Sequence, residues 1–292
     1  MKKSLLFLAA GLIAASMAVS CIININGNGV TWVGDCTEDG IDHVEVREVG
    51  HFSALSSSLP ANVYYVQADK QEVRVETTEE FAPKVLTVVE DGKLSLKLEP
   101  GRYSKMILRV VVSSPDIEGL KVSGSGSLFH EGVLHASGDL VLKVSGSGDM
   151  QVGSVDSKDF SARCSGSGDI RVEGLSCNGF DGSTSGSGIL SMGSVSCDGF
   201  EASVSGSGNF FVDRLNAKGN ASARVSGSGD IRLGEVAVEG DMGLSTSGSG
   251  DITVNGSCRG VTATTSGSGD ISGNLTYTSI STKTTGSGEI SL

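Results

Sequence analysis

The sequence predicts an all-β protein: a right-handed parallel β-solenoid of about nine coils, each of about 20 residues, preceded by a β-rich N-terminal region. Three observations support this fold class. A Ser-Gly-Ser-Gly motif recurs at a near-constant interval, and the residues between its copies alternate between apolar and polar. In addition, 42 glycines with only 4 prolines disfavour both a helical protein and collagen.

The repeat extends over residues 121–292. Its copies begin at Ser123, Ser145, Ser165, Ser185, Ser205, Ser226, Ser247 and Ser266, and a Thr-Gly-Ser-Gly variant begins at Thr285. Successive copies are 19 to 22 residues apart. The residues between the copies are ordered by position, unlike those of a flexible Gly/Ser linker. We therefore expect coils that stack on one another.

Residues at odd distances from the start of each motif are nearly all apolar or small, and those at even distances are mostly polar. This period of two indicates strands with one buried face. Phe160, Phe180 and Phe200 occupy the same odd position in three consecutive coils, which predicts an aromatic stack inside the solenoid. The motif glycines share the inward parity, which predicts either an interior without room for a side chain or a sharp turn. Parallel crossovers are right-handed in nearly all folds, so we expect the solenoid to be right-handed.

Residues 1–20 are typical of a secretory signal peptide, with a basic start, a short apolar run and small residues up to Ser20. The cysteine that follows, Cys21, resembles the bacterial lipoprotein signal. That resemblance implies lipidation of Cys21 and a lipid-anchored protein of the bacterial cell envelope, which we expect at the outer membrane. Several acyl chains on one residue anchor a protein stably. Residues 21–42 are interpreted as a tether, and the choice between a periplasmic and a surface orientation stays open.

Residues 43–120 also alternate, which predicts a β-rich region. It is either a small antiparallel sheet or a set of irregular first coils that cap the solenoid, since an open coil exposes unpaired backbone and core. Asp91-Gly92 lies between two alternating runs and predicts a hairpin.

Several segments resemble a known family. They are Phe52-Ser53-Ala54-Leu55, Ala61-Asn62-Val63-Tyr64, Glu72-Val73-Arg74-Val75, Asp91-Gly92-Lys93-Leu94 and Gly119-Leu120-Lys121-Val122, followed by repeated SGSGDI. In this order, over about residues 43–292, they resemble the bacterial family named "putative auto-transporter adhesin, head GIN domain". The resemblance implies a β-helical envelope protein, frequently a lipoprotein, and it brings no catalytic residues.

A column of acids lies four residues after the start of the motif: Asp149, Asp169, Asp230, Asp251, Asp270 and Glu289. Stacked carboxylates about 5 Å apart suggest Ca²⁺, which favours several oxygen ligands, and we expect no other cofactor. We prefer the alternative that each aspartate organises a turn through its side chain, because Ile189 and Asn209 interrupt the column.

Two further columns are candidates. The residues two positions before each motif form a basic stripe. It would bind an anionic glycan or, as we prefer, it is simply solvent-exposed surface. They are Lys121, Lys143, Arg163, Arg224 and Lys283.

Cys177 and Cys197 lie at the same position of adjacent coils, near enough for a disulfide. Stacked neighbours seldom have suitable dihedrals, so we expect these cysteines to be reduced or only partly paired. The chain has no CxxC or HExxH motif to support zinc chemistry.

These patterns lead to a functional hypothesis. Acids outnumber Lys and Arg by 34 to 22, and the net charge of −12 argues against a nucleic-acid partner. We expect a non-enzymatic envelope lipoprotein, an adhesin or binding module that presents a regular solenoid face to a glycan or protein. The alternatives are a carbohydrate-active enzyme on a β-helix and a purely structural spacer. The last coil ends at Leu292, which leaves an edge for a second copy, so a homo-oligomer is a further expectation.

Overall fold

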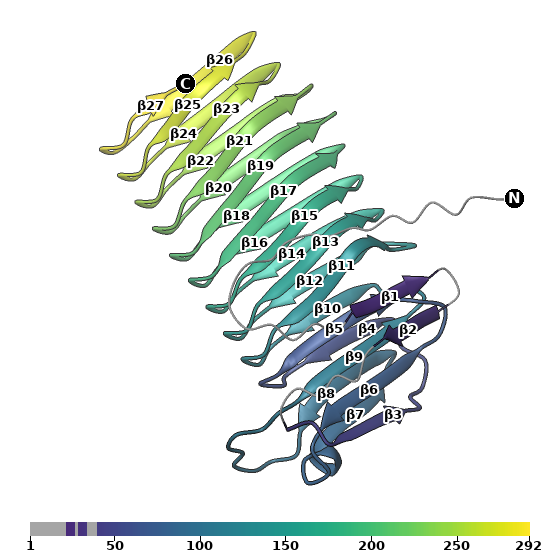
Figure 1. Ribbon diagram of the computed structural model, residues 1–292. Helices are drawn as coiled ribbons and strands as arrows, with labels where there is room; N and C mark the ends of the chain where they lie inside the picture. The colour runs from purple at the N-terminus through teal and green to yellow at the C-terminus, as the bar shows by residue number, and fades with distance from the viewer. Residues whose placement is uncertain (1–21, 27–28, 34–39) are drawn as a thin grey trace, which may run out of the picture.

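The computed structural model describes residues 22–26, 29–33 and 40–292. The predicted signal peptide and the predicted lipidation site at Cys21 lie outside these residues. In the described parts of the chain the only helical element is the short 3-10 helix η1 (Ala82–Lys84). No helix there is long and apolar enough to cross a membrane. The strands form an elongated stack, with the N-terminal strands at one end and the last strands at the other (Figure 1).

Each coil of the repeat adds one strand to each of two sheets, which confirms the predicted parallel β-solenoid of about nine coils. The 12-stranded sheet contains β10 (Gly119–Val122), β12 (Leu140–Val144), β14 (Asp159–Cys164), β16 (Gly179–Thr184), β18 (Gly199–Val204), β20 (Ala221–Val225), β22 (Asp241–Thr246), β24 (Gly260–Thr265) and β26 (Ser279–Thr284). The 13-stranded sheet contains β11 (Leu128–His135), β13 (Met150–Asp156), β15 (Ile170–Ser176), β17 (Ile189–Cys197), β19 (Asn209–Ala217), β21 (Ile231–Val238), β23 (Ile252–Ser257), β25 (Ile271–Thr276) and β27 (Ile290–Ser291).

The core between the two sheets consists of columns of like residues, because the parallel register places each side chain on its counterpart in the next coil. Phe160, Phe180 and Phe200 pair in register and form the predicted aromatic stack. Their ring centroids are 6.0 and 4.8 Å apart, with interplanar angles of 12° and 7°. Phe210 from the opposite sheet meets Phe180 and Phe200 edge-on. Both geometries are favourable for aromatic rings.

One buried column was missed by the odd-position rule. In five coils it lies ten residues after the start of the motif, at Val155, Leu175, Val195, Leu215 and Val236. Leu134 and Leu275 continue the column at the two ends, eleven and nine residues after their motifs. In β13 and β15 the pairing passes from Val152–Val172 directly to Ser154–Gly174, which leaves Gly153 and Glu173 out of the register. This irregularity resembles a β-bulge repeated from coil to coil. It shifts the inward parity by one residue, so an even position becomes buried.

The Ser-Gly-Ser-Gly motif forms the turn from the 12-stranded to the 13-stranded sheet, and it continues the ladder between coils. The backbone N–H groups of Ser167 and Gly168 both donate to the carbonyl oxygen of Gly146 in the preceding coil, at 3.1 and 3.2 Å. A Cβ at Gly168 would overlap the carbonyl oxygen of Gly148. The glycines thus lie at a turn and have no room for a side chain, as expected, and the main obstacle is the backbone of the neighbouring coil.

The N-terminal region adds two more parallel coils, made of β4 (Ala54–Ser57) with β5 (Asn62–Gln67), and of β8 (Lys93–Leu98) with β9 (Arg109–Ser114). Their order in space differs from their order in the chain. β4 lies between β8 and β10, and β5 lies between β9 and β11. One hydrophobic core continues through these coils and the repeat, from Phe52 to Leu275.

Antiparallel strands close this end of the solenoid, so both expected kinds of N-terminal structure occur together. β3 (His43–Arg47) pairs with β6 (Glu72–Thr77), β6 with β9, and β7 (Val85–Glu90) with β8. The predicted hairpin joins β7 and β8: Asp91 and Gly92 have φ of 51° and 70°, as a tight two-residue hairpin turn requires. Within the segment interpreted as a tether, β1 (Ile22–Asn26) pairs antiparallel with β2 (Gly29–Val33).

The motif glycines provide a first test. Replacement of Gly168 by Ala forces the backbones of two coils apart, and we expect a loss of about 1–3 kcal/mol in the free energy of unfolding. Gly138→Ala is the matched control, because a Cβ at Gly138 has no atom within 4 Å. Thermal denaturation followed by circular dichroism compares the two variants. An unchanged melting temperature for Gly168→Ala would contradict the close approach of the coils.

Candidate functional site

The predicted acid column lies where the Ser-Gly-Ser-Gly turn enters the 13-stranded sheet, and it forms a ladder of hydrogen bonds along the solenoid. Oδ1 of Asp149 accepts the N–H of Asp169 at 2.9 Å, and Oδ1 of Asp169 accepts the N–H of Ile189 at 2.7 Å. The ladder resumes at Asn209, whose Oδ1 accepts the N–H of Asp230. Further along, the acceptors are Asp230, Asp251 and Asp270, and the donors are Asp251, Asp270 and Glu289, at 2.8 to 2.9 Å.

This ladder gives the aspartates a structural role close to the one we preferred, with one difference. Each side chain stabilises the next coil rather than its own turn. Because the asparagine at position 209 supplies an equivalent amide oxygen, the column is continuous there in hydrogen bonding although not in charge. Among the described residues no group of three or more His, Cys, Asp or Glu is arranged to hold a metal ion. Calcium binding by the column stays a prediction.

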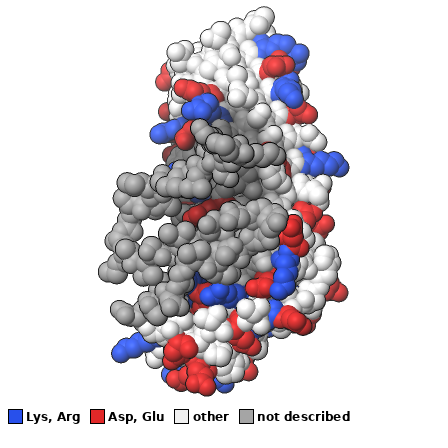
Figure 2. Space-filling view, turned by 45° about the vertical axis from the view of Figure 1, so that its right-hand side comes forward, with Lys and Arg blue, Asp and Glu red and all other residues white. Residues whose placement is uncertain are grey.

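The basic column lies on the outer face of the 12-stranded sheet, and two of its arginines form ion pairs with acids of the next or the preceding coil. Arg163 contacts Asp181 at 2.8 Å, and Arg224 contacts Glu201 at 3.1 Å. On the face shown in Figure 2, positive and negative side chains lie interspersed. Two of the five basic residues of the column are thus neutralised by neighbouring acids, which weakens the case for a polyanionic ligand.

Cys177 and Cys197 lie near the corner where the 13-stranded sheet leads back to the 12-stranded sheet, and both are free thiols. Burial raises the pKa of the Cys177 thiol to about 12 and that of the Cys197 thiol to about 11. Both are therefore protonated near neutral pH, and a protonated thiol is a poor nucleophile. The partial or absent pairing of these cysteines stays a prediction.

His130 is a buried polar residue that the sequence pattern did not single out. Its side chain is 6% exposed and points into the core at a position held by valine in the next coil. Nδ1 lies 3.0 Å from the carbonyl oxygen of Tyr65, and Nε2 has no hydrogen-bond partner among the described residues. Burial lowers the pKa of the imidazole, so His130 is neutral at physiological pH. It packs as part of the core.

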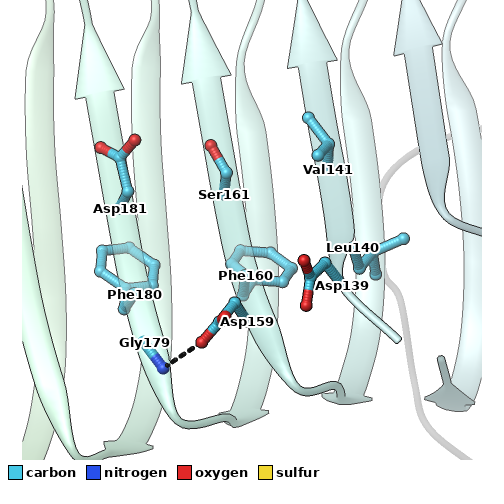
Figure 3. A pocket seen from close by; sticks show the side chains of 9 residues that line it. All are labelled: Asp139, Leu140, Val141, Asp159, Phe160, Ser161, Gly179, Phe180 and Asp181. Carbon is cyan, nitrogen blue, oxygen red and sulfur yellow. Dashed lines mark hydrogen bonds between the residues drawn. The ribbon is translucent and has the colours of Figure 1, made fainter. Parts of the chain in front are cut away.

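A shallow groove with a volume of about 340 Å³ crosses the starts of β12, β14 and β16 (Figure 3). Its lining follows three columns. The first rim, six residues before the motif, consists of Asp139, Asp159 and Gly179; the floor consists of Leu140, Phe160 and Phe180; the second rim consists of Val141, Ser161 and Asp181. Oδ1 of Asp159 accepts the N–H of Gly179 at 2.9 Å, which fixes the orientation of this carboxylate.

A second groove of about 320 Å³ continues the first across β16, β18 and β20, and both are lined by Gly179 and Phe180. Here the first rim consists of Gly179, Gly199 and Asn220, and the second rim of Glu201 and Ser222. The two together, called the rim groove below, follow the solenoid axis over five coils. The sequence signal for it was the change from aspartate to glycine at positions 179 and 199, which we did not interpret. The rim lacks side chains there, but Phe180 and Phe200 beneath it remain buried.

Comparison with known proteins shows the family from the sequence and the fold from solved structures. The sequence model of the family described as "Putative auto-transporter adhesin, head GIN domain" matches residues 51–235. No curated protein matches the chain.

Several solved structures have a similar fold. A putative adhesin from Bacteroides fragilis is 18% identical with a TM-score of 0.51, and the match covers 85% of this chain and 95% of that one. A putative lipid binding protein from Parabacteroides distasonis is 21% identical with a TM-score of 0.59, and a putative adhesin from Parabacteroides merdae is 17% identical with a TM-score of 0.60. Each of these two matches covers 87% of this chain and 97% of the other. At such identities the likeness concerns the fold.

The aspartate ladder can be tested at Asp251. Asp251→Ala removes the acceptor for the N–H of Asp270, and we expect a loss of about 0.5–1.5 kcal/mol in the free energy of unfolding. Asp251→Asn keeps a side-chain oxygen and should unfold like the wild type. Chemical denaturation of the three proteins, with and without calcium, provides the measurement. A calcium-dependent stability that Asp251→Asn abolishes would contradict a purely structural ladder.

Proposed function

This chain belongs to the family of putative auto-transporter adhesins with a head GIN domain, and from this premise we propose that it is a non-enzymatic binding protein that presents a regular solenoid face to a glycan or a protein. The family indicates a cell-envelope protein. The similar structures from Bacteroides fragilis and Parabacteroides merdae are themselves named putative adhesins, which supports this choice over an enzyme.

The observation that carries the proposal is the preorganised outer face of the 12-stranded sheet. Every strand from β10 to β24 in this sheet is hydrogen-bonded on both sides, so its outward side chains are held at intervals of about 4.8 Å. Ion pairs between coils further restrain Arg163 and Arg224. A ligand that meets a rigid surface loses less free energy to the ordering of side chains. Such a face suits recognition of an extended, repetitive partner.

We further propose that the protein is anchored in the outer membrane through lipid on Cys21. The signal-like residues 1–20 and the cysteine directly after them support this arrangement. With a net charge of −12, the protein is repelled by anionic lipid, so the acyl chains supply the membrane affinity.

Replacement of Cys21 by Ser tests the anchor. The wild type should incorporate an alkyne-labelled fatty acid and sediment with the outer membrane, whereas Cys21→Ser should remain unlabelled and appear in the soluble envelope fraction. Cys177→Ser is the matched control and should behave like the wild type. Membrane sedimentation of an unlabelled Cys21→Ser protein would contradict anchoring by lipid.

The Cys21→Ser protein also serves as a soluble probe for the binding function. We expect saturable binding to at least one member of a panel of bacterial and host glycans and matrix proteins, with every glycan recovered at its original length. Size analysis of the recovered glycans provides the readout. Shortened glycans would indicate the enzyme alternative, and failure to bind any member would favour the structural spacer.

A further inference from the structure

We propose that the hairpin of β1 and β2 lies in the interfacial region of the membrane and forms a second, accessory contact beside the lipid anchor. This inference rests on the proposed lipidation of Cys21, and it adds a partner surface, the bilayer, and the residues that meet it. Three features of the hairpin support it: its position in the chain, its pairing register and its lack of charge.

The hairpin begins directly after the proposed anchor. β1 starts at Ile22, the residue that follows Cys21, and a strand of five residues extends over about 16 Å. Acyl chains on Cys21 would therefore hold the whole hairpin within reach of the membrane surface. A short connection raises the effective concentration of the tethered group, so a contact too weak to bind a membrane by itself still forms.

The pairing register divides the hairpin into two faces. Residues directly opposite each other in an antiparallel pair share a face, and successive residues along a strand alternate between the faces. The first face contains the pairs Ile23–Trp32 and Ile25–Val30. The second contains Asn24–Thr31 and Asn26–Gly29, with Ile22–Val33 at the end next to Cys21. The hairpin is thus amphipathic, and its first face is wholly apolar.

The charge of the chain changes sharply at the end of the hairpin. Residues 22–34 include no charged residue, whereas Asp35, Glu38 and Asp39 follow within five positions. An uncharged segment between the lipid-bearing residue and an acidic one matches the passage from a membrane surface to water. Because carboxylates are repelled by anionic lipid, the contact must be apolar in origin.

The physical needs of the hairpin are met in the interface. Two short strands on their own are marginally stable in water and need a surface that covers their apolar face. The hydrocarbon core does not suit them, because β1 and β2 pair only with each other and their outer edges need water. The interfacial region provides both apolar contact and water, and tryptophan, present here as Trp32, is enriched there.

The solenoid does not require the hairpin as a cap. The strands β1 and β2 form a sheet of their own, separate from the two sheets of the solenoid. The N-terminal end of the solenoid is closed by antiparallel strands, β3 on β6 and β7 on β8. The hairpin is therefore free to contact the membrane.

The fluorescence of Trp32 tests this contact, because Trp32 is the only tryptophan in the chain. The lipidated wild type is reconstituted in vesicles of phosphatidylcholine and phosphatidylethanolamine, with and without lipids brominated on their acyl chains. We expect the brominated lipids to quench Trp32, and added phosphatidylglycerol not to increase the quenching. The Cys21→Ser protein, mixed with the same vesicles, should remain unquenched, since so small an apolar face binds only marginally without acyl chains.

Two double variants of β1 show which face makes the contact. Ile23→Ser with Ile25→Ser removes apolar residues from the first face and should lower the equilibrium constant for insertion about tenfold or more, seen as loss of most of the quenching. Asn24→Ser with Asn26→Ser is the matched control, because it changes the second face of the same strand, and its quenching should equal that of the wild type. Incorporation of the alkyne-labelled fatty acid verifies that both variants carry lipid.

The outcomes separate this inference from the proposed anchor. A wild type that is lipidated and sediments with membranes, but whose Trp32 is not quenched, would overturn the interfacial contact and leave the anchor intact. Equal shielding of Trp32 from acrylamide with and without vesicles would show that the hairpin packs on the protein itself, which also overturns the contact. Equal quenching in the wild type and in Cys21→Ser would overturn both, since the hairpin would then bind without acyl chains.

Discussion

The hydrogen-bond ladder from coil to coil is the constraint on which the rest of this structure depends. It is unbroken through the turn between the two sheets: Ser165 donates its N–H to Val144, and Ser167 and Gly168 donate theirs to Gly146. A turn that bonds to the turn below it must approach it at the spacing of a sheet, about 4.8 Å. At the two glycine positions of each motif this spacing leaves no room for a Cβ. The repeated motif is thus a requirement of backbone contact.

The same spacing dictates what side chains can do. An inward residue meets its counterpart one coil away, so flat rings can stack and the core fills by columns. An outward residue meets its counterpart as well, and like charges at that distance repel each other. Two kinds of contact offset this repulsion: aspartate side chains accept the backbone N–H of the next coil, and arginines of one coil pair with acids of another.

The rim groove shows how a repeat acquires a local property. Along the first rim the residue changes from aspartate in two coils to glycine in the next two and then to asparagine, while the floor remains apolar. A change at one position of three or four coils is enough to open a surface depression, because every neighbouring position is held by the ladder. In this architecture, substitutions at one position of successive coils can change the surface locally without altering the fold.

Much of the fold followed from the sequence alone. The period of the motif predicted the number of coils, and the parity of the apolar residues predicted inward columns such as Phe160, Phe180 and Phe200. Asp91-Gly92 predicted the hairpin. Each of these features depends on a local preference that is either repeated along the chain or confined to a few residues. Only the tertiary structure decided the buried column of Val155 and Leu175, since a bulge changes parity without changing composition. It also decided that β4 lies between β8 and β10, because strands of equal pattern are interchangeable until they pack. The partners of Asp149 and Arg163 and the open space beside Gly199 could not be predicted either, since they depend on residues in other coils and not on the nearest residues in the chain.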